Sequence, residues 1–354
     1  MNPALLSSVR RSVLLAGVLC SLAVPAFALK YAAVEHHIPA DPKLPVWKPG
    51  PVASVPEEEL NLVGADIMDE ITLGWIKLYR EAYPRLSVTM EARASGSGVP
   101  ALTAGIAHMA PVGREALPKE HDDFVKKFGY EPFAIKVATG SLGSLGKTAT
   151  SIVLVAKDNP IKGLTFAQLE AIYAKEPKLG LKPVTKWGEL GLTGEWADRP
   201  IHPYGLKPPN GIEQFVKWKV LNWGEWRDGI QNVKGQGFTH AFTVASNDMH
   251  TQLGGITYAL LANVTPDVRV VPLAVKAGDP FIMPTLETVY NHTYPLSRFV
   301  YIFVNRPPGT KLEPKVKEFL KLVLSKQGQD VVSAEGVFMP LQPEVVQEEL
   351  AKLD

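Results

Sequence analysis

Residues 59–98, ELNLVGADIMDEITLGWIKLYREAYPRLSVTMEARASGSG, contain the pattern that decides the expected fold. Glu59–Gly64 is typical of a first strand, and Asp69–Ala82 places apolar residues at helical spacing. Pro84 ends that helix, and Leu86–Met90 predicts the next strand. Alternating strands and helices are typical of a mainly parallel sheet that helices cover on both faces. The stretch therefore predicts an α/β protein.

The rest of the chain continues this alternation, and no internal repeat interrupts it. After a helix over 100–107 and a short apolar run before Arg114, the pattern predicts further strands at 133–138, 151–156, 201–204 and 299–304. It also predicts helices at 164–173, 210–221, 313–324, 327–333 and 344–353. Thr165 is a candidate N-cap for the first of these helices.

The first 28 residues have the features of a secretory signal. Arg10 and Arg11 form a basic start, Val13–Val24 is apolar, and Ala26-Phe27-Ala28 is an A-x-A cleavage site. The two arginines also leave a twin-arginine signal open. Because the apolar stretch is short for a membrane span, we expect a soluble, periplasmic mature protein.

The amino-acid composition limits the classes of protein to which this chain can belong. The chain has 354 residues, 46% of them hydrophobic and 21% charged, which suits two ordinary globular domains. Its single cysteine, Cys20, lies inside the signal, so the mature chain has no disulfide or thiolate chemistry. Removing the signal leaves basic and acidic residues nearly balanced, which does not favour nucleic acid or an acidic membrane surface. Residues 29–57 are rich in proline and predict a loosely packed lead-in.

Three short polar segments follow predicted strands: Gly64-Ala65-Asp66-Ile67, Ala94-Ser95-Gly96-Ser97-Gly98 and Gly113-Arg114-Glu115. The first two open helix-like runs, so their N–H groups and hydroxyls lie at helix N-termini, where partial positive charge favours an anion. This combination suits a small oxyanion that is bound and released rather than chemically changed. The candidate ligand-binding residues here are Asp66, Ile67, Ser95, Gly96, Ser97 and Arg114.

Structural interpretations of the same residues stay open. Asp66 is placed where it could cap a helix, and Ser95 and Ser97 are common turn residues. Arg114 could be an ordinary surface arginine. In the functional hypothesis, Asp66 accepts the O–H of a protonated oxyanion such as hydrogen phosphate. Sulfate has no such O–H, so it would face the bare carboxylate at a cost in free energy.

Enzyme and nucleotide-binding alternatives find little support in the sequence. The chain contains neither H-E-x-x-H nor G-x-S-x-G. The insert 140–150, GSLGSLGKTAT, lacks the first glycine of a nucleotide phosphate loop, because Ser141 stands there. The tryptophan side chains are better explained by packing in the core than by a platform on which a sugar ring stacks. We therefore expect no catalysis, no metal and no cofactor.

Several blocks of the chain resemble the periplasmic phosphate-binding proteins of ABC transporters and, more broadly, the type II solute-binding fold. The similarity extends over about 60–341, and its distinctive blocks are Asp158–Ile161, Trp187–Trp196, Tyr294–Phe299 and Gly336–Leu341. The resemblance implies two α/β lobes, two crossover strands and a ligand in the cleft between the lobes. It implies that lobe 1 comprises 58–138 and 290–354, and lobe 2 comprises 139–289. It also suggests that Asp66, Ser95, Ser97 and Arg114 form the half of the site in lobe 1.

The second half of the site departs from the family pattern. Where family members place an arginine and a Ser-Gly-Thr group, this chain has Leu206 and Asn210-Gly211-Ile212. Asn210 and Gly211 can still start a helix whose N–H groups face an anion. We expect the insert 140–150 to supply the missing donors as a flexible hairpin at the cleft mouth, with candidates Ser141, Ser144, Lys147 and Thr148.

The predicted function is that of a periplasmic solute-binding protein, which captures phosphate or a related oxyanion for an ABC transporter. The two lobes close on the ligand, and the closed form docks on a membrane permease. The alternative is a secreted protein with an altered or lost ligand that acts as a sensor or scaffold. We expect a monomer that binds no nucleic acid.

Overall fold

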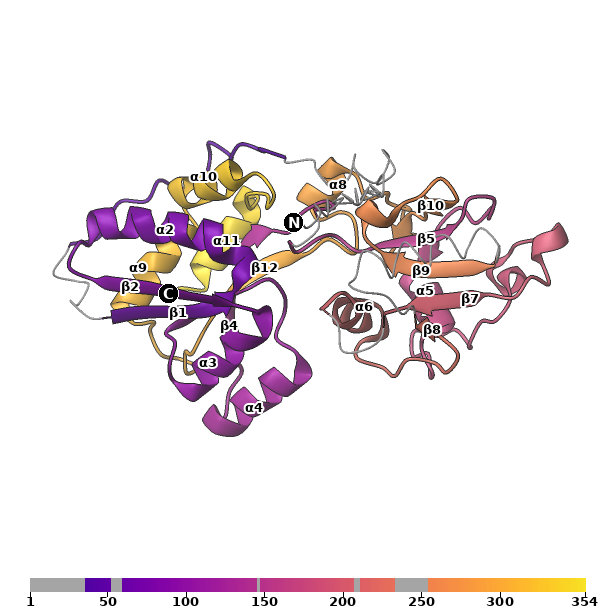
Figure 1. Ribbon diagram of the computed structural model, residues 1–354, viewed down its shortest axis with the longest axis horizontal. Coiled ribbons are helices and arrows are strands. Elements are labelled where there is room, and N and C mark those ends of the chain that lie inside the picture. The colour runs from indigo at the N-terminus through magenta and orange to yellow at the C-terminus, as the bar shows by residue number, and fades with distance from the viewer. Residues whose placement is uncertain (1–35, 52–58, 145–146, 207–210, 233–253) are drawn as a thin grey trace, which may run out of the picture.

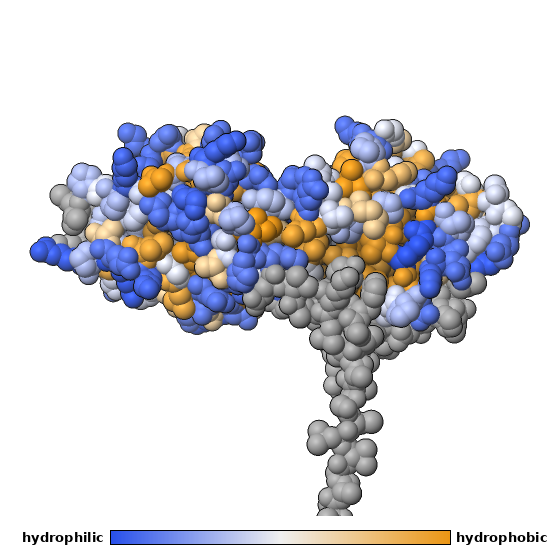
Figure 2. Space-filling view, turned by 90° about the horizontal axis from the view of Figure 1, so that it is seen from above, coloured by the Kyte–Doolittle hydropathy of each residue, from blue (hydrophilic) through white to orange (hydrophobic). Residues whose placement is uncertain are grey.

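The computed structural model describes residues 36–51, 59–144, 147–206, 211–232 and 254–354, so the expected signal lies outside the described residues. The described chain forms two lobes, each with its own sheet and core (Figure 1). A narrower part joins the two masses, with a hollow on one side (Figure 2). The predicted two-lobed α/β architecture is confirmed.

Lobe 1 contains a five-stranded sheet in the order β2-β1-β3-β12-β4. Its strands are β1 (Glu59–Ala65), β2 (Ser87–Arg93), β3 (Met109–Val112), β4 (Phe133–Thr139) and β12 (Phe299–Val304). Strand β1 pairs in parallel with β2 and β3, whereas β12 runs antiparallel to both β3 and β4. The sheet is therefore mixed, and its parallel part brings the carboxyl ends of β1, β2 and β3 to one edge.

Six α-helices are described in lobe 1: α2 (Asp69–Ala82), α3 (Gly98–Ala104), α4 (Pro118–Phe128), α9 (Pro314–Val323), α10 (Lys326–Glu335) and α11 (Pro343–Ala351). Helix α2 ties the start of the chain to its end, because the Trp75 indole donates to the Gly328 carbonyl at 2.8 Å. The Tyr79 hydroxyl likewise donates to the Lys315 carbonyl at 2.8 Å. The helix predicted from Pro100 begins earlier, at Gly98, and α4 was not predicted at all.

The expectation of a loosely packed lead-in is wrong for residues 36–51. Ala40 and Leu44 are buried in the core of lobe 1. The ring centroids of Trp47 and Tyr79 are 6.3 Å apart, and the Trp47 indole N–H donates to the Glu318 carboxylate at 2.9 Å. Proline removes backbone donors but leaves side chains free to pack, so an extended segment can still be fixed to the domain.

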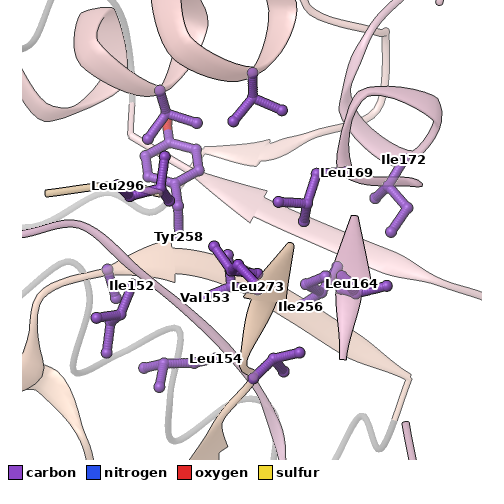
Figure 3. Packing of buried hydrophobic residues seen from close by; sticks show 14 of the residues in the cluster. Ile152, Val153, Leu154, Leu164, Leu169, Ile172, Ile256, Tyr258, Leu273 and Leu296 are labelled. Carbon is purple, nitrogen blue, oxygen red and sulfur yellow. The ribbon is translucent and has the colours of Figure 1, made fainter. Parts of the chain in front are cut away.

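Lobe 2 contains a second five-stranded sheet in the order β10-β5-β9-β7-β8. The strands are β5 (Ile152–Ala156), β7 (His202–Gly205), β8 (Gln231–Asn232), β9 (Gly255–Ala259) and β10 (Val268–Val270). A small parallel pair, β6 (Leu164–Thr165) with β11 (Leu273–Ala274), lies beside it. The described helices are α5 (Phe166–Tyr173), α6 (Gly211–Leu221) and α8 (Leu286–Tyr290). Figure 3 shows the aliphatic core that these elements bury.

Helix α5 starts two residues later than predicted, because Leu164 and Thr165 pair with β11. Thr165 is the N-cap as expected, and its hydroxyl accepts the Gln168 N–H at 3.2 Å. Within the described residues, no helix is long and apolar enough to cross a membrane.

The chain passes between the sheets twice, after β4 and before β12. The two passages lie side by side, because the Gly140 N–H donates to the Arg298 carbonyl at 2.8 Å. A second contact joins the Thr139 hydroxyl and the His292 Nε2, 2.9 Å apart. This pair of adjacent crossovers therefore connects the two lobes.

Candidate functional site

The three polar segments follow β1, β2 and β3 at the shared edge of the lobe 1 sheet. The register pairs Ala65 with Arg93, which brings the residues after each strand together. Asp66–Met68 and Ser95–Ser97 form short 3-10 turns that lead into α2 and α3. Gly98 permits this convergence, because a Cβ there would lie 2.6 Å from a methyl of Val112. The predicted clustering of the three segments is thus a property of the fold.

Arg114 lies half-buried beside the second of these turns. Its guanidinium forms two hydrogen bonds to the Glu120 carboxylate, at 2.8 and 2.7 Å, and a third to the Glu115 carbonyl at 2.8 Å. The side chains of Arg114 and Glu120 are each only 11% exposed. A Cβ on Gly96 would lie 3.7 Å from the terminal nitrogen of Arg114. Glu120 therefore holds the guanidinium against the Ser95–Ser97 turn, so Arg114 is no ordinary surface arginine.

Asp66 exposes its carboxylate at the same edge. One of its oxygens accepts the Ile67 N–H at 2.9 Å, so the carboxylate is oriented by its own turn. The residue that precedes α2 is Met68, and no side chain caps that helix. Asp66 is therefore not the cap of α2, and its second oxygen is available to a ligand.

Ser97 contributes a hydroxyl that is partly used within its turn. It donates to the Ala94 carbonyl at 2.8 Å, which leaves the oxygen lone pairs and the turn N–H groups as the polar atoms on offer. Ser95 is half-buried and Gly96 is exposed. The absence of a side chain at Gly96 lets a ligand approach both the backbone and the Arg114 guanidinium.

The glycine-rich insert is fixed to lobe 1 at the described residues. The Thr148 hydroxyl donates to the Gly113 carbonyl at 2.7 Å, and the Lys147 ammonium donates to the Ile67 carbonyl at 3.1 Å. Lys147 also forms an ion pair of 2.7 Å with Glu335. Gly113 makes room for this contact, since a Cβ there would lie 2.3 Å from Ile67 and 2.7 Å from Thr148.

These bonds differ from the expected free hairpin at the cleft mouth. Lys147 and Thr148 are engaged by lobe 1, because buried carbonyls and carboxylates there need donors. Ser141 bonds through its backbone to Thr148, with an N–H to carbonyl distance of 2.7 Å. Its side-chain hydroxyl is buried and has no hydrogen-bond partner among the described residues. Ser141 is thus an insert residue with a buried hydroxyl that is uncommitted among the described residues.

On the side of lobe 2, helix α6 begins at Gly211, while Asn210 lies outside the described residues. Leu206, where the family pattern has an arginine, is 6% exposed and belongs to the lobe 2 core. Its N–H donates to the Tyr258 hydroxyl at 2.9 Å. A hydrophobic side chain is stable at this position, and it brings no charge to the cleft.

A small cavity joins the two sides. Lobe 1 and the second crossover provide part of its lining, and α6 with the loop after it provides the rest: Arg114, Glu115, Leu117, Gly211, Gln214, Phe215, Trp218, Trp223 and Arg298. The cavity brings Arg114 and Gly211 of the predicted set together across the lobes. Sequence reasoning did not select Glu120, whose carboxylate also accepts the Leu117 N–H at 2.9 Å at the start of α4. It also left Arg298 out of the site, although the Tyr294–Phe299 block that contains it was singled out as a feature of the family resemblance.

The site combines N–H, hydroxyl and guanidinium donors with one exposed carboxylate acceptor. Such a set can bind a partly protonated oxyanion. Within the part of the chain that the structure describes, no group of three or more histidine, cysteine or acidic side chains is arranged to hold a metal ion. The arrangement is that of a binding site in a two-lobed solute-binding protein.

Comparisons with known proteins agree with this class. The family model described as a PBP superfamily domain matches residues 51–327. The phosphate-binding protein PstS of Pseudomonas aeruginosa PAO1 is 36% identical over 314 residues, which cover 88% of this chain and 91% of that protein. The chain therefore belongs to the PBP superfamily and, within it, to the family of PstS phosphate-binding proteins.

More distant relatives support the fold. Protein SphX of Synechococcus elongatus is 24% identical over 271 residues, covering 74% of this chain and 72% of that protein. The crystal structure of PstS from Borrelia burgdorferi has a TM-score of 0.53 at 18% identity, covering 80% of this chain and 99% of that chain. An ABC-type phosphate transport receptor from Vibrio cholerae has a TM-score of 0.50 at 16% identity, covering 79% and 99%. These two structures support the fold, whereas the 36% identity to a phosphate-binding protein confirms the prediction of a binding protein rather than an enzyme.

Proposed function

We propose that this protein captures phosphate, or a closely related oxyanion, and delivers it to an ABC transporter. The ligand lies between Asp66, Ile67, Ser95, Gly96, Ser97 and Arg114 on lobe 1 and the start of α6 at Gly211 on lobe 2. The candidate Asn210 lies outside the described residues and stays a prediction from the sequence. Ser141 adds a hydroxyl from the insert. The lobe limits predicted from the sequence, 58–138 with 290–354 and 139–289, belong to the same proposal, and the composition of the two sheets supports them.

One observation carries the proposal. The Arg114 guanidinium is held by Glu120 against the Gly96 turn, at the edge where three strands end. A prealigned guanidinium binds an oxyanion without first losing side-chain entropy. Membership of the PstS family supports phosphate as the anion. The same membership supports capture over the alternative of a sensor or scaffold.

The transport role follows from the same family and from the form of the molecule. The residues before Leu29 export the chain to the periplasm, and the mature protein acts as a monomer. Phosphate stabilises the closed arrangement of the lobes only through contacts that are stronger there. The closed form then docks on the membrane permease of the transporter.

A thermal-shift panel on the purified mature protein tests the proposal. Phosphate, phosphonate, sulfate, arsenate and molybdate are added one at a time, and calorimetry follows for each anion that raises the unfolding temperature. Phosphate at 100 times its dissociation constant should stabilise the protein by about 2.7 kcal/mol. Arsenate should act similarly, whereas sulfate should have a much smaller effect because Asp66 opposes a fully deprotonated anion. Equal stabilisation by sulfate, or none by phosphate, would contradict the proposal.

A further inference from the structure

Arg298 is a buried cation that the predicted site did not include. It lies directly before β12, on the second crossover, and is only 5% exposed. Its guanidinium stacks on the Phe215 ring of α6, 4.4 Å from the ring centroid. The Nε atom is buried without a hydrogen-bond partner among the described residues. Within the same residues, Arg298 forms no ion pair, and its direct side-chain contact there is the stacking on Phe215.

Burying a guanidinium without a hydrogen-bond or ion-pair partner destabilises the folded protein. Removing a charge from water costs several kcal/mol unless an opposite charge or hydrogen bonds replace the lost hydration. A cation–π contact with a phenylalanine returns only part of that cost. The position of Arg298 therefore makes sense if an anion occupies the neighbouring space during function.

The neighbouring space is the cavity that already contains Arg114. Arg298 lines it together with Gly211 and Gln214, which belong to the first turn of α6. That helix has 11 residues, and its first N–H groups carry the partial positive charge of a helix N-terminus. Two guanidiniums and a helix N-terminus thus converge on one place between the lobes.

We propose that Arg298 is the second fixed positive charge of the oxyanion site and replaces the arginine whose position Leu206 occupies. This inference rests on the proposed function, because it assigns a further residue to the same ligand. The charge comes from the crossover rather than from the loop before α6. Because the Arg298 carbonyl accepts the Gly140 N–H, the residue is fixed where the two crossovers meet.

The charges around Arg298 agree with this assignment. Burial lowers the pKa of its guanidinium, and the positive charge of Arg114 acts in the same direction, whereas Glu115 opposes both. Glu115 is engaged by the Tyr301 hydroxyl, which lies 3.1 Å from its carboxylate oxygen. A bound anion would place a negative charge beside the Arg298 guanidinium and offset the cost of burying it.

Phosphate binding by the variants R298Q and R298K tests the inference. R298Q removes the charge and keeps a polar side chain, and its phosphate affinity by calorimetry should fall about ten-fold or more. R298K keeps the charge without the two-pronged geometry and should recover part of the loss. Without phosphate, R298Q should unfold at the temperature of the parent or above, since a buried charge has been removed. A merely structural arginine would show the reverse: lower stability of the ligand-free protein and unchanged affinity.

R269Q is the matched control. Arg269 is also partly buried, but its guanidinium donates to the backbone carbonyl of Asn159 at 3.0 Å, within lobe 2. R269Q should lower the unfolding temperature and leave the dissociation constant unchanged. If the parent binds phosphate and R298Q binds equally well, the inference fails while the proposed function stands. If the parent binds none of the oxyanions in the panel, both fail.

Discussion

The lobe 1 side of the cleft carries Asp66, Ser97 and Arg114 at the ends of neighbouring strands, whereas α6 on the lobe 2 side lines the shared cavity with Phe215 and Trp218. On lobe 1, three separate turns each contribute polar atoms. On lobe 2, the described lining is a helix start, one glutamine and aromatic rings, and Leu206 is buried in the core. The two sides therefore differ in both the number and the charge of their hydrogen-bonding groups.

This asymmetry indicates how the ligand is recognised. Lobe 1 is prealigned: Glu120 fixes Arg114, the Asp66 turn fixes its own carboxylate, and the insert is bonded to Gly113 and Ile67. Lobe 2 offers mainly a surface that excludes water and a helix dipole. We infer that lobe 1 selects the anion, while lobe 2 and the crossover strengthen its contacts on closure. The predictions below test that division, in order of decreasing effect.

The largest effect is expected from R114A. Removing the guanidinium deletes charge-assisted hydrogen bonds worth about 1.5–3 kcal/mol, so phosphate affinity should fall roughly ten- to a hundred-fold. Calorimetry on the purified mature protein measures the change. R93A is the control, because Arg93 lies close by in sequence, on β2, but is exposed and paired with Glu91. An R114A protein that binds like R93A would remove Arg114 from the site.

The next effect concerns which anion lobe 1 selects. D66N keeps the shape of the side chain but adds an N–H donor, which suits a fully deprotonated anion. The ratio of phosphate to sulfate affinity should fall by about ten-fold, since about 1.4 kcal/mol of discrimination corresponds to that factor. Competition calorimetry with the two anions gives the ratio. If the ratio does not change, the Asp66 carboxylate only stabilises its own turn and does not select the anion.

A smaller effect is expected from a charge placed on the lobe 2 side. Gly211 is exposed, and a Cβ there would meet no atom of the described residues within 4 Å, so these residues leave room for a side chain. G211D puts a negative charge at the start of α6, which suits the helix dipole but repels an anion. Phosphate affinity should fall about two- to five-fold with no loss of thermal stability, corresponding to the ~0.3–1 kcal/mol of such dipole interactions.

G211N supplies the matched control for this change. It has the shape of the aspartate without its charge, so its phosphate affinity should stay close to that of the parent. Equal losses in G211D and G211N would mean that the side chain blocks closure. Binding that is unaffected by the aspartate would place the ligand away from α6.

The smallest effect concerns the crossover that joins the two sides. Burial lowers the pKa of His292 to about 4, with Lys136 and Lys219 adding to the effect. The folded protein therefore keeps this imidazole neutral, whereas the unfolded chain binds a proton below its ordinary pKa of 6.5. The stability from the neutral form is present above pH 6.5 and is lost as the pH falls towards 4.

The loss between pH 7 and pH 5 should be about 1 kcal/mol, after allowance for the partial exposure of the ring. H292N removes the titrating group and tolerates the positive φ of 57° at this residue. Denaturant unfolding of H292N should show a correspondingly weaker dependence on pH. H121N is the control, because neighbouring carboxylates raise the pKa of His121 rather than lower it. An unchanged pH profile in H292N would show that the imidazole does not titrate in this range.

Much of the architecture could be predicted from local patterns. Asp69–Ala82 was predicted as a helix with the same bounds that the structure gives to α2, because apolar spacing and a closing proline are properties of adjacent residues. Phe299–Val304 was likewise predicted within the bounds of β12. The antiparallel direction of β12 was not predictable, since it depends on where the chain re-enters lobe 1. Helix α4 was missed because its charged surface leaves few apolar positions to recognise.

By itself, the sequence predicted the alternating strands and helices and the polar segments at Asp66, Ser95–Ser97 and Arg114 as candidates for an oxyanion site, and the family resemblance implied the two lobes. The hydrophobic pattern and the chemistry of each side chain depend only on neighbouring residues, so they can be recognised in the sequence alone. Only the tertiary structure decided that Glu120 holds Arg114, that Lys147 and Thr148 bond to lobe 1, and that Arg298 stacks on Phe215 of α6. These are contacts between distant or differently oriented segments. Their energies depend on burial and direction, which arise only when both lobes and the crossovers are in place.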